Sequence, residues 1–210
     1  MINIRFLGNA CIEIIGDDDH IIIDPNYFVA PRKGINKVLI THEHDDHVNP
    51  EKLVEIRNKY IRENQDLEIY GSKSVDQKLD MGIKVVGQGD KIQLEDGDIE
   101  VFKNNCWKAE DCLAFLVLLA GREILHTADS ANYSDELRKV QQDIDCCFVA
   151  CFEDYYENYF EFMRKISPKL VIPYHYGEGN EEMAKNLIEY IKEKDKINIR
   201  YLEIGGEFEL

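Results

Sequence analysis

The sequence predicts an α/β fold in which two β-sheets pack face to face and helices cover their outer faces. The first half reads mainly as short apolar runs separated by turn-forming residues, which is typical of strands. The second half begins with a strand pair and then alternates strands with segments whose apolar residues recur at helical spacing. Long β regions followed by alternating elements indicate two sheets enclosed by helices.

The first half contains most of the expected strands. Four short strands are predicted in residues 2–7, 10–15, 20–24 and 38–41. Asn49 and Pro50 then supply an N-cap and a first helical residue, and helical apolar spacing continues to about Asn64. A further β region follows over roughly residues 67–103.

The second half supplies the alternating elements. A strand pair is expected at residues 113–120 and 123–128, joined at Gly121. The predicted order then continues with a helix at 134–142, a strand at 146–151, a helix at 155–166, a strand at 170–174, a helix at 181–194 and a final strand pair ending at residue 210. We expect a single domain over residues 1–210, with two pseudo-repeated halves of about 1–103 and 104–210.

Charge and composition restrict the classes of binding partner that we expect. The formal net charge of −16 argues against a nucleic-acid backbone as the partner. No apolar run approaches the roughly 18 residues needed to cross a membrane, and the amino terminus reads as a strand instead of a signal peptide. We therefore expect a cytoplasmic protein with a small-molecule substrate, no nucleic-acid or membrane partner, and an oligomeric state left open.

Six cysteines are present, at positions 11, 106, 112, 146, 147 and 151. Without a secretory signal, reduced thiols are the expectation and a disulfide framework is not. Most of them lie in apolar strand-like runs, where cysteine behaves as a small hydrophobic residue.

The most informative stretch follows the fourth predicted strand. His42, His44 and His47 lie within six residues, interleaved with Glu43, Asp45 and Asp46. A solvated acidic loop is one interpretation, and a metal site is the other. Imidazoles two residues apart on an extended segment can face the same way. Together with carboxylate oxygens they suit zinc, manganese or iron.

The pattern His42-x-His44-x-Asp46-His47 resembles the HxHxDH signature of the metallo-β-lactamase superfamily, whose members are two-metal hydrolases. The resemblance implies a four-layer αββα sandwich of two mixed sheets. It covers nearly the whole chain, because other segments are similar to family motifs: residues 4–10, 21–25, 125–130 and 171–177. Among the branches, the chain most resembles the stand-alone lactonase-like group that includes ascorbate-6-phosphate lactonase.

The resemblance implies a site with two divalent metal ions, zinc first, with manganese and iron as alternatives. His42 and His44 would hold the first ion, and Asp129 would bridge the two. The second ion would be held by Asp46, His47 and His175. Asp24 matches a carboxylate that orients a ligand histidine from behind.

Two departures from the family pattern stand out. The family supplies a third histidine to the first ion from a loop that is here residues 103–112, which contains no histidine. Cys106 is the best substitute, since zinc–thiolate bonds are strong. The alternatives are water and the oxygen-bearing side chains of Asn104, Asn105, Glu110 and Asp111. The second departure is Asn9, which stands where the lactonase-like group has histidine.

The implied activity is hydrolysis of a small molecule by a metal-bridged hydroxide, at an ester, lactone, amide or phosphoester bond. Asp46 would orient the nucleophile and Asp129 would hold the metal pair. The alternative is a degenerate superfamily member that binds one metal ion with little or no hydrolytic activity. We interpret His126 as a core neighbour of the site, and the aromatic residues 155–162 as helix packing in preference to a substrate wall.

Overall fold

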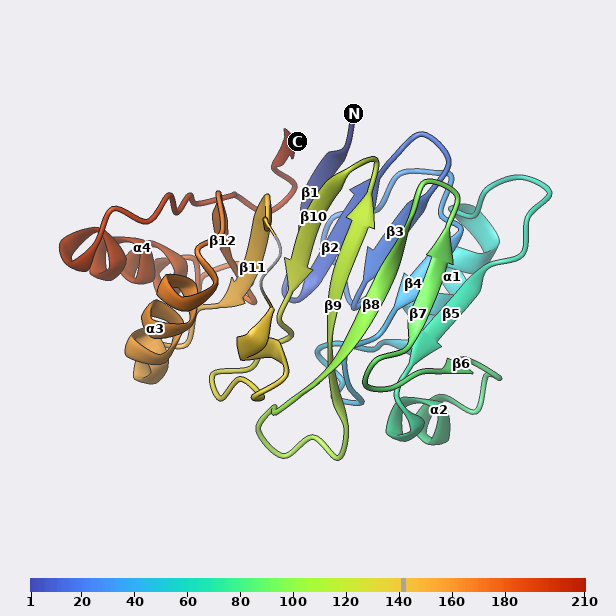
Figure 1. Ribbon diagram of the computed structural model, residues 1–210. Helices are drawn as coiled ribbons and strands as arrows, with labels where there is room; N and C mark the ends of the chain where they lie inside the picture. Colours follow the sequence, from blue (N-terminus) through green and yellow to red (C-terminus); the bar gives the residue numbers. More distant parts are fainter. Residues whose placement is uncertain (141–142) are drawn as a thin grey trace.

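The computed structural model describes residues 1–140 and 143–210. Two mixed β-sheets face each other, with helices on the outside (Figure 1). The predicted α/β sandwich is therefore confirmed.

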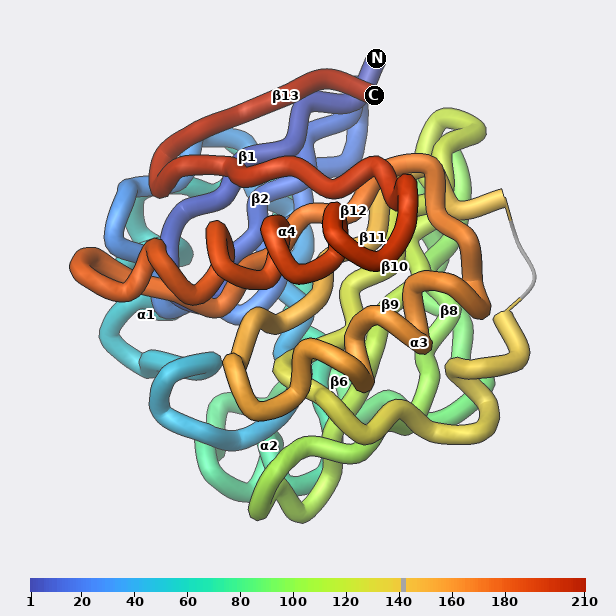
Figure 2. Tube along the Cα trace, turned by 90° about the vertical axis from the view of Figure 1, so that its left-hand side faces the viewer, coloured from blue at the N-terminus to red at the C-terminus, as the bar shows by residue number. Residues whose placement is uncertain are grey.

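The first sheet has the strand order β13-β1-β2-β3-β4-β5-β6. β1 to β3 form an antiparallel meander, whereas β3 to β6 run parallel. The strands are β1 (Asn3–Gly8), β2 (Cys11–Ile15), β3 (His20–Ile23), β4 (Lys37–Leu39), β5 (Glu68–Gly71), β6 (Lys84–Val85) and β13 (Glu207–Glu209). β13 pairs with β1, so the two ends of the chain lie side by side (Figure 2).

The second sheet has the order β12-β11-β10-β9-β8-β7. β7 to β10 are antiparallel, and β10 to β12 are parallel. The strands are β7 (Lys91–Leu94), β8 (Gly97–Asn104), β9 (Cys112–Leu119), β10 (Arg122–His126), β11 (Cys146–Ala150) and β12 (Val171–Tyr174). Parallel strands end at the same edge of each sheet, so the segments after β3, β4, β10 and β12 can converge.

The helices are α1 (Pro50–Lys59), α2 (Lys73–Leu79), α3 (Tyr156–Ile166) and α4 (Glu182–Lys194). Leu53 and Ile56 of α1 and Val75 of α2 pack on Ile22 and Val38 of the first sheet. α3 and α4 lie beside β11 and β12 at the opposite side of the molecule (Figures 1 and 2). None of the helices in the described residues combines the length and the apolar character needed to cross a bilayer.

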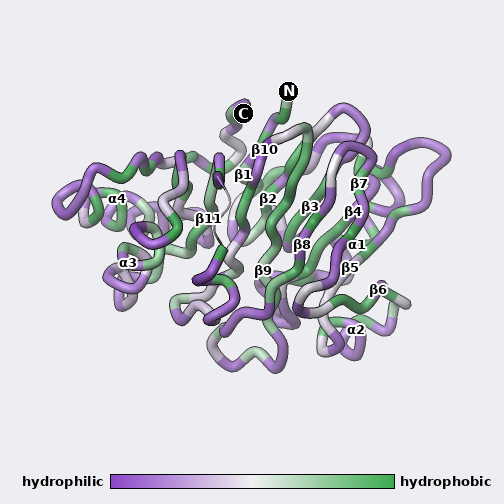
Figure 3. Tube along the Cα trace, viewed as in Figure 1, coloured by the Kyte–Doolittle hydropathy of each residue, from purple (hydrophilic) through white to green (hydrophobic). Residues whose placement is uncertain are grey.

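The main core fills the space between the sheets. Ile4 and Phe6 of the first sheet join Phe115, Val117 and Phe148 of the second in one buried cluster. Hydrophobic residues accordingly concentrate along the strands, and hydrophilic ones along the outer helices and loops (Figure 3). This packing fixes the two sheets relative to each other and so fixes the loops at their shared edge.

The structure corrects four of the predicted elements. Residues 73–79 form α2 within the predicted β region, because Ser72 caps the helix through Val75 N despite a weak apolar pattern. Within the predicted helix 134–142, the described residues hold only a 3₁₀ turn at Leu137–Lys139, and residues 141 and 142 lie outside the described part. α1 ends at Lys59 and not near Asn64. The predicted final strand pair is a single strand, β13, paired with β1.

The two sheets do not divide the chain at its middle. β7 and β8, placed in the first half by the sequence, belong to the second sheet. Their antiparallel pairing with β9 decides this, because each hairpin closes within one sheet.

Candidate metal centre

The histidine-rich segment is a loop anchored to the first sheet. It follows β4 and ends where Asn49 caps α1 through Glu51 N and Lys52 N. Asp24, directly after the neighbouring strand β3, accepts hydrogen bonds from Thr41 N and Thr41 Oγ1, each at 2.8 Å. Both residues are fully buried. The first loop residue is therefore held rigidly before the ligand candidates begin.

The second sheet contributes Asp129 and His175 to the same place. Asp129 follows β10 and His175 follows β12. The backbone turns sharply at both points, with φ of 55° at Ala128 and 69° at His175. Left-handed backbone at a non-glycine residue costs energy and is found mostly where the fold needs a specific side-chain direction.

These residues form two groups of possible ligands. The first half-site consists of His42 and His44, whose Nε2 and Nδ1 atoms lie 3.1 Å apart. The second half-site consists of Asp46, His47 and His175. In it, His175 Nε2 lies 3.1 Å from His47 Nε2 and 3.3 Å from Asp46 Oδ2.

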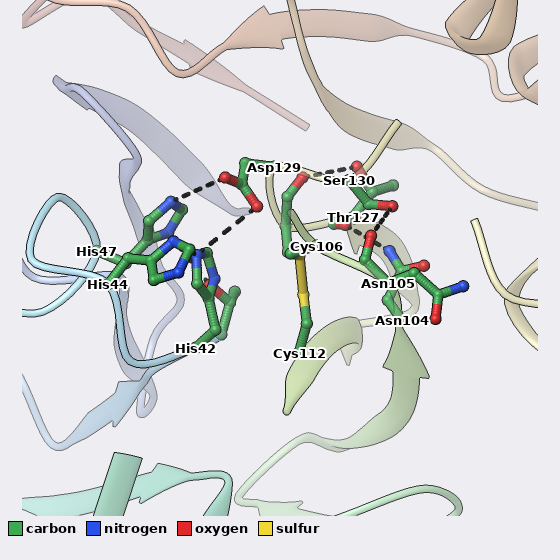
Figure 4. Close-up of a disulfide and its surroundings, with 12 residues drawn as sticks. His42, His44, His47, Asn104, Asn105, Cys106, Cys112, Thr127, Asp129 and Ser130 are labelled. Carbon is green, nitrogen blue, oxygen red and sulfur yellow. Dashed lines mark hydrogen bonds and ion pairs between the residues drawn. A yellow bond between two sulfur atoms is a disulfide. The ribbon is translucent and has the colours of Figure 1, made fainter. Parts of the chain in front are cut away.

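Asp129 stands between the half-sites and turns one oxygen toward each (Figure 4). Its Oδ1 lies 3.8 Å from His42 Nε2, and its Oδ2 lies 3.6 Å from His47 Nε2. The structure thus brings together every ligand candidate from the HxHxDH segment with Asp129 and His175.

The arrangement fits metal ions. Ligand atoms about 2.0–2.1 Å from a tetrahedral zinc ion lie about 3.3 Å from one another. Two of the three separations within the second half-site are close to that value, and the third, between His47 Nε2 and Asp46 Oδ2, is 3.9 Å. In addition, Asp129 Oδ1 is buried, and no described group donates a hydrogen bond to it. A buried carboxylate oxygen without a partner is costly, and a cation between it and His42 removes that cost.

The electrostatics of the two half-sites differ. Burial alone would lower the pKa of His47, but the carboxylates of Asp24 and Asp129 outweigh it and raise that pKa to about 10. Asp24 Oδ2 lies 2.7 Å from His47 Nδ1, as the sequence predicts for an orienting carboxylate. Burial and the charge of His47 lower the pKa of His42 to about 4. Without metal, His47 therefore holds a proton that His42 does not.

The fold and the ligand pattern agree with the comparison with known families. The model of the beta-lactamase superfamily domain matches residues 3–175, which is most of the chain. The chain belongs to the metallo-β-lactamase superfamily. The resemblance predicted from the sequence is confirmed at this level.

One relative agrees in class, and two solved structures share the fold. A protein from Natranaerobius thermophilus named UPF0173 metal-dependent hydrolase is 24% identical, with 99% of both chains covered. The metallo-β-lactamase fold protein YhfI from Bacillus subtilis superposes with a TM-score of 0.81 at 15% identity, covering 99% of this chain and 98% of that one. Igni18, a metallo hydrolase from Ignicoccus hospitalis, gives 0.76 at 15% identity, covering 100% and 99%. The prediction of a metal-dependent hydrolase is confirmed as a class.

The loop that lacks the superfamily histidine holds a disulfide. Cys106 is bonded to Cys112, the first residue of β9 (Figure 4). The expectation that all cysteines are reduced is therefore wrong for this pair, whereas the other four are free and buried. The hairpin explains the pairing, because it brings the two Cα atoms to 5.9 Å, within the usual range for a disulfide. As a disulfide, Cys106 carries no thiolate for a metal ion.

Other residues of this loop form hydrogen bonds that hold its conformation. Asn104 Nδ2 donates to Thr127 O, and Asn105 Nδ2 donates to Asn132 O. Glu43 Oε1 accepts from Glu110 N at 2.8 Å, and Leu113 N donates to Thr41 O at 2.9 Å. The disulfide loop is thus tied to the histidine loop of the facing sheet.

Sequence reasoning missed the role of Glu43, which lies between two ligand candidates and reads as part of the acidic cluster. Cys112 was also missed, because within the loop 103–112 only Cys106 was considered as a thiolate ligand. Asn9 is better explained by the structure. Its side chain donates to Asp46 O, and its backbone N donates to Tyr176 O at 2.8 Å. It therefore links the loops that carry Asp46 and His175.

A cavity of about 420 Å³ opens beside the first half-site. Its lining residues are Asn105, Cys106, Trp107, Asp129, Ala131, Asn132, Phe152 and Tyr155. Tyr155 lines this cavity, whereas Tyr159 and Phe162 are buried in the core. The aromatic segment therefore serves both packing and the cavity wall. His126 is fully buried next to Tyr174, as expected for a core neighbour.

Proposed function

We propose that this metal-dependent hydrolase binds two divalent metal ions, one at each half-site, with Asp129 between them. The observation that carries the proposal is the pair of Asp129 oxygens turned toward separate histidines, one of them buried without a hydrogen-bond donor. His42 and His44 would hold the first ion, and Asp46, His47 and His175 the second. Imidazole and carboxylate donors favour zinc, with manganese and iron as alternatives.

When bound, the two ions would supply a hydroxide nucleophile near neutral pH and polarise the bond under attack. Neighbouring residues of the chain keep Asp46 charged and hold the ring of His47 in one orientation. A hydrogen bond from His175 holds the pKa of Asp46 below its ordinary range, so that this half-exposed side chain stays a carboxylate that can orient the nucleophile. Asp24 fixes the ring of His47 from behind.

The cavity favours an ester or lactone substrate over a phosphoester. Its walls are aromatic at Trp107, Phe152 and Tyr155, and Asn105 and Asn132 add amide groups. Among the described residues that line it, none is basic, so a phosphate group would find no cationic side chain there besides the ions themselves. The volume suits a small molecule. This agrees with the predicted lactonase-like branch, which stays part of the proposal.

The alternative is a protein that binds one ion with little or no hydrolysis. The disulfide favours it, because the first half-site then has only two histidines and one oxygen of Asp129. The second half-site would remain complete.

Metal content per chain tests the proposal first, by elemental analysis of protein purified under reducing conditions. Two equivalents, together with hydrolysis of aryl esters or lactones, are the expected result. Asp46→Asn should abolish hydrolysis. Asp45→Asn is the matched control, since Asp45 is exposed and pairs with Lys78 instead of the site. One equivalent and no hydrolysis of either substrate class would favour the alternative.

A further inference from the structure

The Cys106–Cys112 disulfide lies directly against the first half-site (Figure 4). One donor atom from each of His42, Cys106, Cys112 and Asp129 falls within 4.8 Å of all the others. The free cysteines are instead buried at Cys11, Cys146, Cys147 and Cys151. The bonded pair is thus placed among potential ligands, and it stands in the loop where the histidine is missing.

Stabilisation is a weak explanation for this disulfide. It spans six positions, and β8 and β9 already pair up to Asn104 and Cys112. Closing a short loop that a hairpin already holds removes little freedom from the chain. Two further hydrogen bonds, from Glu110 N to Glu43 and from Leu113 N to Thr41, also hold the loop in place.

The charge around the disulfide points to a cation. Asp129 Oδ1, buried and without a described donor, faces His42 Nε2 at 3.8 Å. A disulfide presents neutral sulfur, which binds zinc-like ions poorly, whereas thiolates bind them strongly. With both sulfurs reduced, one imidazole, two thiolates and one carboxylate would surround a single point, and His44 lies beside His42. The first half-site would then hold enough donors for a four- or five-coordinate ion.

We propose that the disulfide is the oxidised, metal-poor state of the first half-site, and that its reduction supplies Cys106 and Cys112 as thiolate ligands for a thiophilic divalent ion. They act with His42 and Asp129 and take the place of the missing histidine. The inference rests on the proposed function for the identity of the half-site. It adds that the redox state of two cysteines sets whether the centre holds one ion or two.

The chemistry balances with a dithiol as the reductant. Its thiolate attacks Cys106 Sγ, which is half-buried and lines the cavity, and the bond to Cys112 Sγ breaks. The second thiol of the reductant then releases Cys106, so that the reductant leaves as a disulfide and the protein gains two electrons and two protons. Each cysteine thiol gives its proton to solvent when its sulfur binds the ion.

Cobalt binding to the whole chain tests this inference, because thiolate–cobalt bonds give a charge-transfer absorption in the near ultraviolet that nitrogen and oxygen ligands do not. Protein with the disulfide intact should bind about one Co²⁺ without this band. After dithiol reduction and removal of the reductant, it should bind a second Co²⁺ with the band. Cys106→Ser and Cys112→Ser should each reduce the band by about half, and the double variant should lose it. Cys147→Ala, a buried free cysteine away from the site, should keep it in full.

Thiol counting under denaturing conditions completes the test. Four reactive thiols are expected before reduction and six after it, from the six cysteines of the chain. Six thiols in air-oxidised protein would overturn the redox part. A second cobalt ion that binds without the band would overturn the thiolate ligands and leave the dinuclear proposal standing. Absence of cobalt binding in both states would overturn the proposed function itself.

Discussion

The two half-sites are carried by the same loop but completed by different parts of the molecule. The second half-site is finished by His175, and its His47 is backed by the buried carboxylate of Asp24. The first half-site lacks the third histidine and faces the Cys106–Cys112 disulfide across the sheet boundary. One is preorganised by a conventional ligand set, and the other depends on the chemical state of a neighbouring loop.

The two half-sites therefore differ in how far their ligands are arranged before an ion binds. A ligand oriented by a second hydrogen-bonded partner binds its ion with little rearrangement. A ligand locked in a covalent bond to another ligand is not available at all until that bond is broken. Substitutions, pH and redox conditions should therefore change metal binding at one half-site without an equal change at the other.

Removal of Asp129 should have the largest effect, because it is the residue that both half-sites share. Asp129→Ala should lower the metal content from two ions to nearly none and hydrolysis by more than about 100-fold, since even outer partners of ligands are worth about 10–100-fold. Elemental analysis and ester hydrolysis measure this. Asp135→Ala, an exposed carboxylate on the same connection, is the control. A variant that keeps both ions would end the bridging assignment.

The affinity of the second half-site for its ion should depend on pH. The raised pKa of His47, about 10, means that an ion must displace a proton at neutral pH. In protein with the disulfide intact, affinity should rise by about tenfold per pH unit between pH 6 and 8. His42, with a pKa of about 4, adds no proton to this exchange. A chelator competition titration at several pH values measures the slope, and a flat profile would contradict the assignment.

The stability of the metal-free protein should change with pH in the opposite direction to its metal affinity. In metal-free protein the stabilisation from charged His47 is fully present below the unfolded pKa of about 6.5 and is lost as pH rises through about 10. Thermal unfolding in the presence of a chelator should therefore show a falling transition temperature over that window.

Asp24→Asn should affect the second half-site alone. Asparagine tolerates the left-handed backbone at this position, where φ is 52°, and it can still accept from Thr41 N. The loss of the carboxylate behind His47 should lower the affinity of the second half-site for its ion by about 10–100-fold. The affinity of the first half-site should not change. Asp18→Asn, at an exposed position in the turn between β2 and β3, should change neither affinity. Equal weakening of both ions would show that Asp24 acts on the whole loop.

Glu43→Ala should give the smallest effect, and at the first half-site. Glu110 N loses its acceptor, so the disulfide loop should loosen. One such hydrogen bond is worth about 0.5–1.5 kcal/mol, or about 2- to 13-fold in affinity for the first ion of reduced protein. Glu110→Ala is the matched control, because its backbone N–H can still donate. If both variants behave alike, the link between the loops does not position the cysteines.

Much of this protein could be predicted from local sequence. The strand after Gly34, the capped helix at Pro50 and the parallel strands β11 and β12 follow from apolar runs and turn residues within a few positions. The cluster around His42 could be found because three histidines and their carboxylates occupy neighbouring positions. Asp129 and His175 needed the family resemblance, since each stands alone in its segment.

Other features could not be read locally. α2 has few apolar residues and is decided by the Ser72 cap and by packing on the first sheet. β13 has no pattern that names β1 as its partner, because strand pairing between distant residues depends on the whole fold.

The sequence by itself determined the fold class and the superfamily, and it supplied most of the candidate metal ligands, because these depend on residue type, spacing along the chain and resemblance to family motifs. Only the tertiary structure decided which groups lie next to each of these residues. The hydrogen bond from Glu110 N to Glu43 and the two-sided position of Asp129 arise where the edges of the two sheets meet. The place of the Cys106–Cys112 pair beside His42 and Asp129 arises there too. Sheet packing sets those distances, and no short stretch of sequence encodes them.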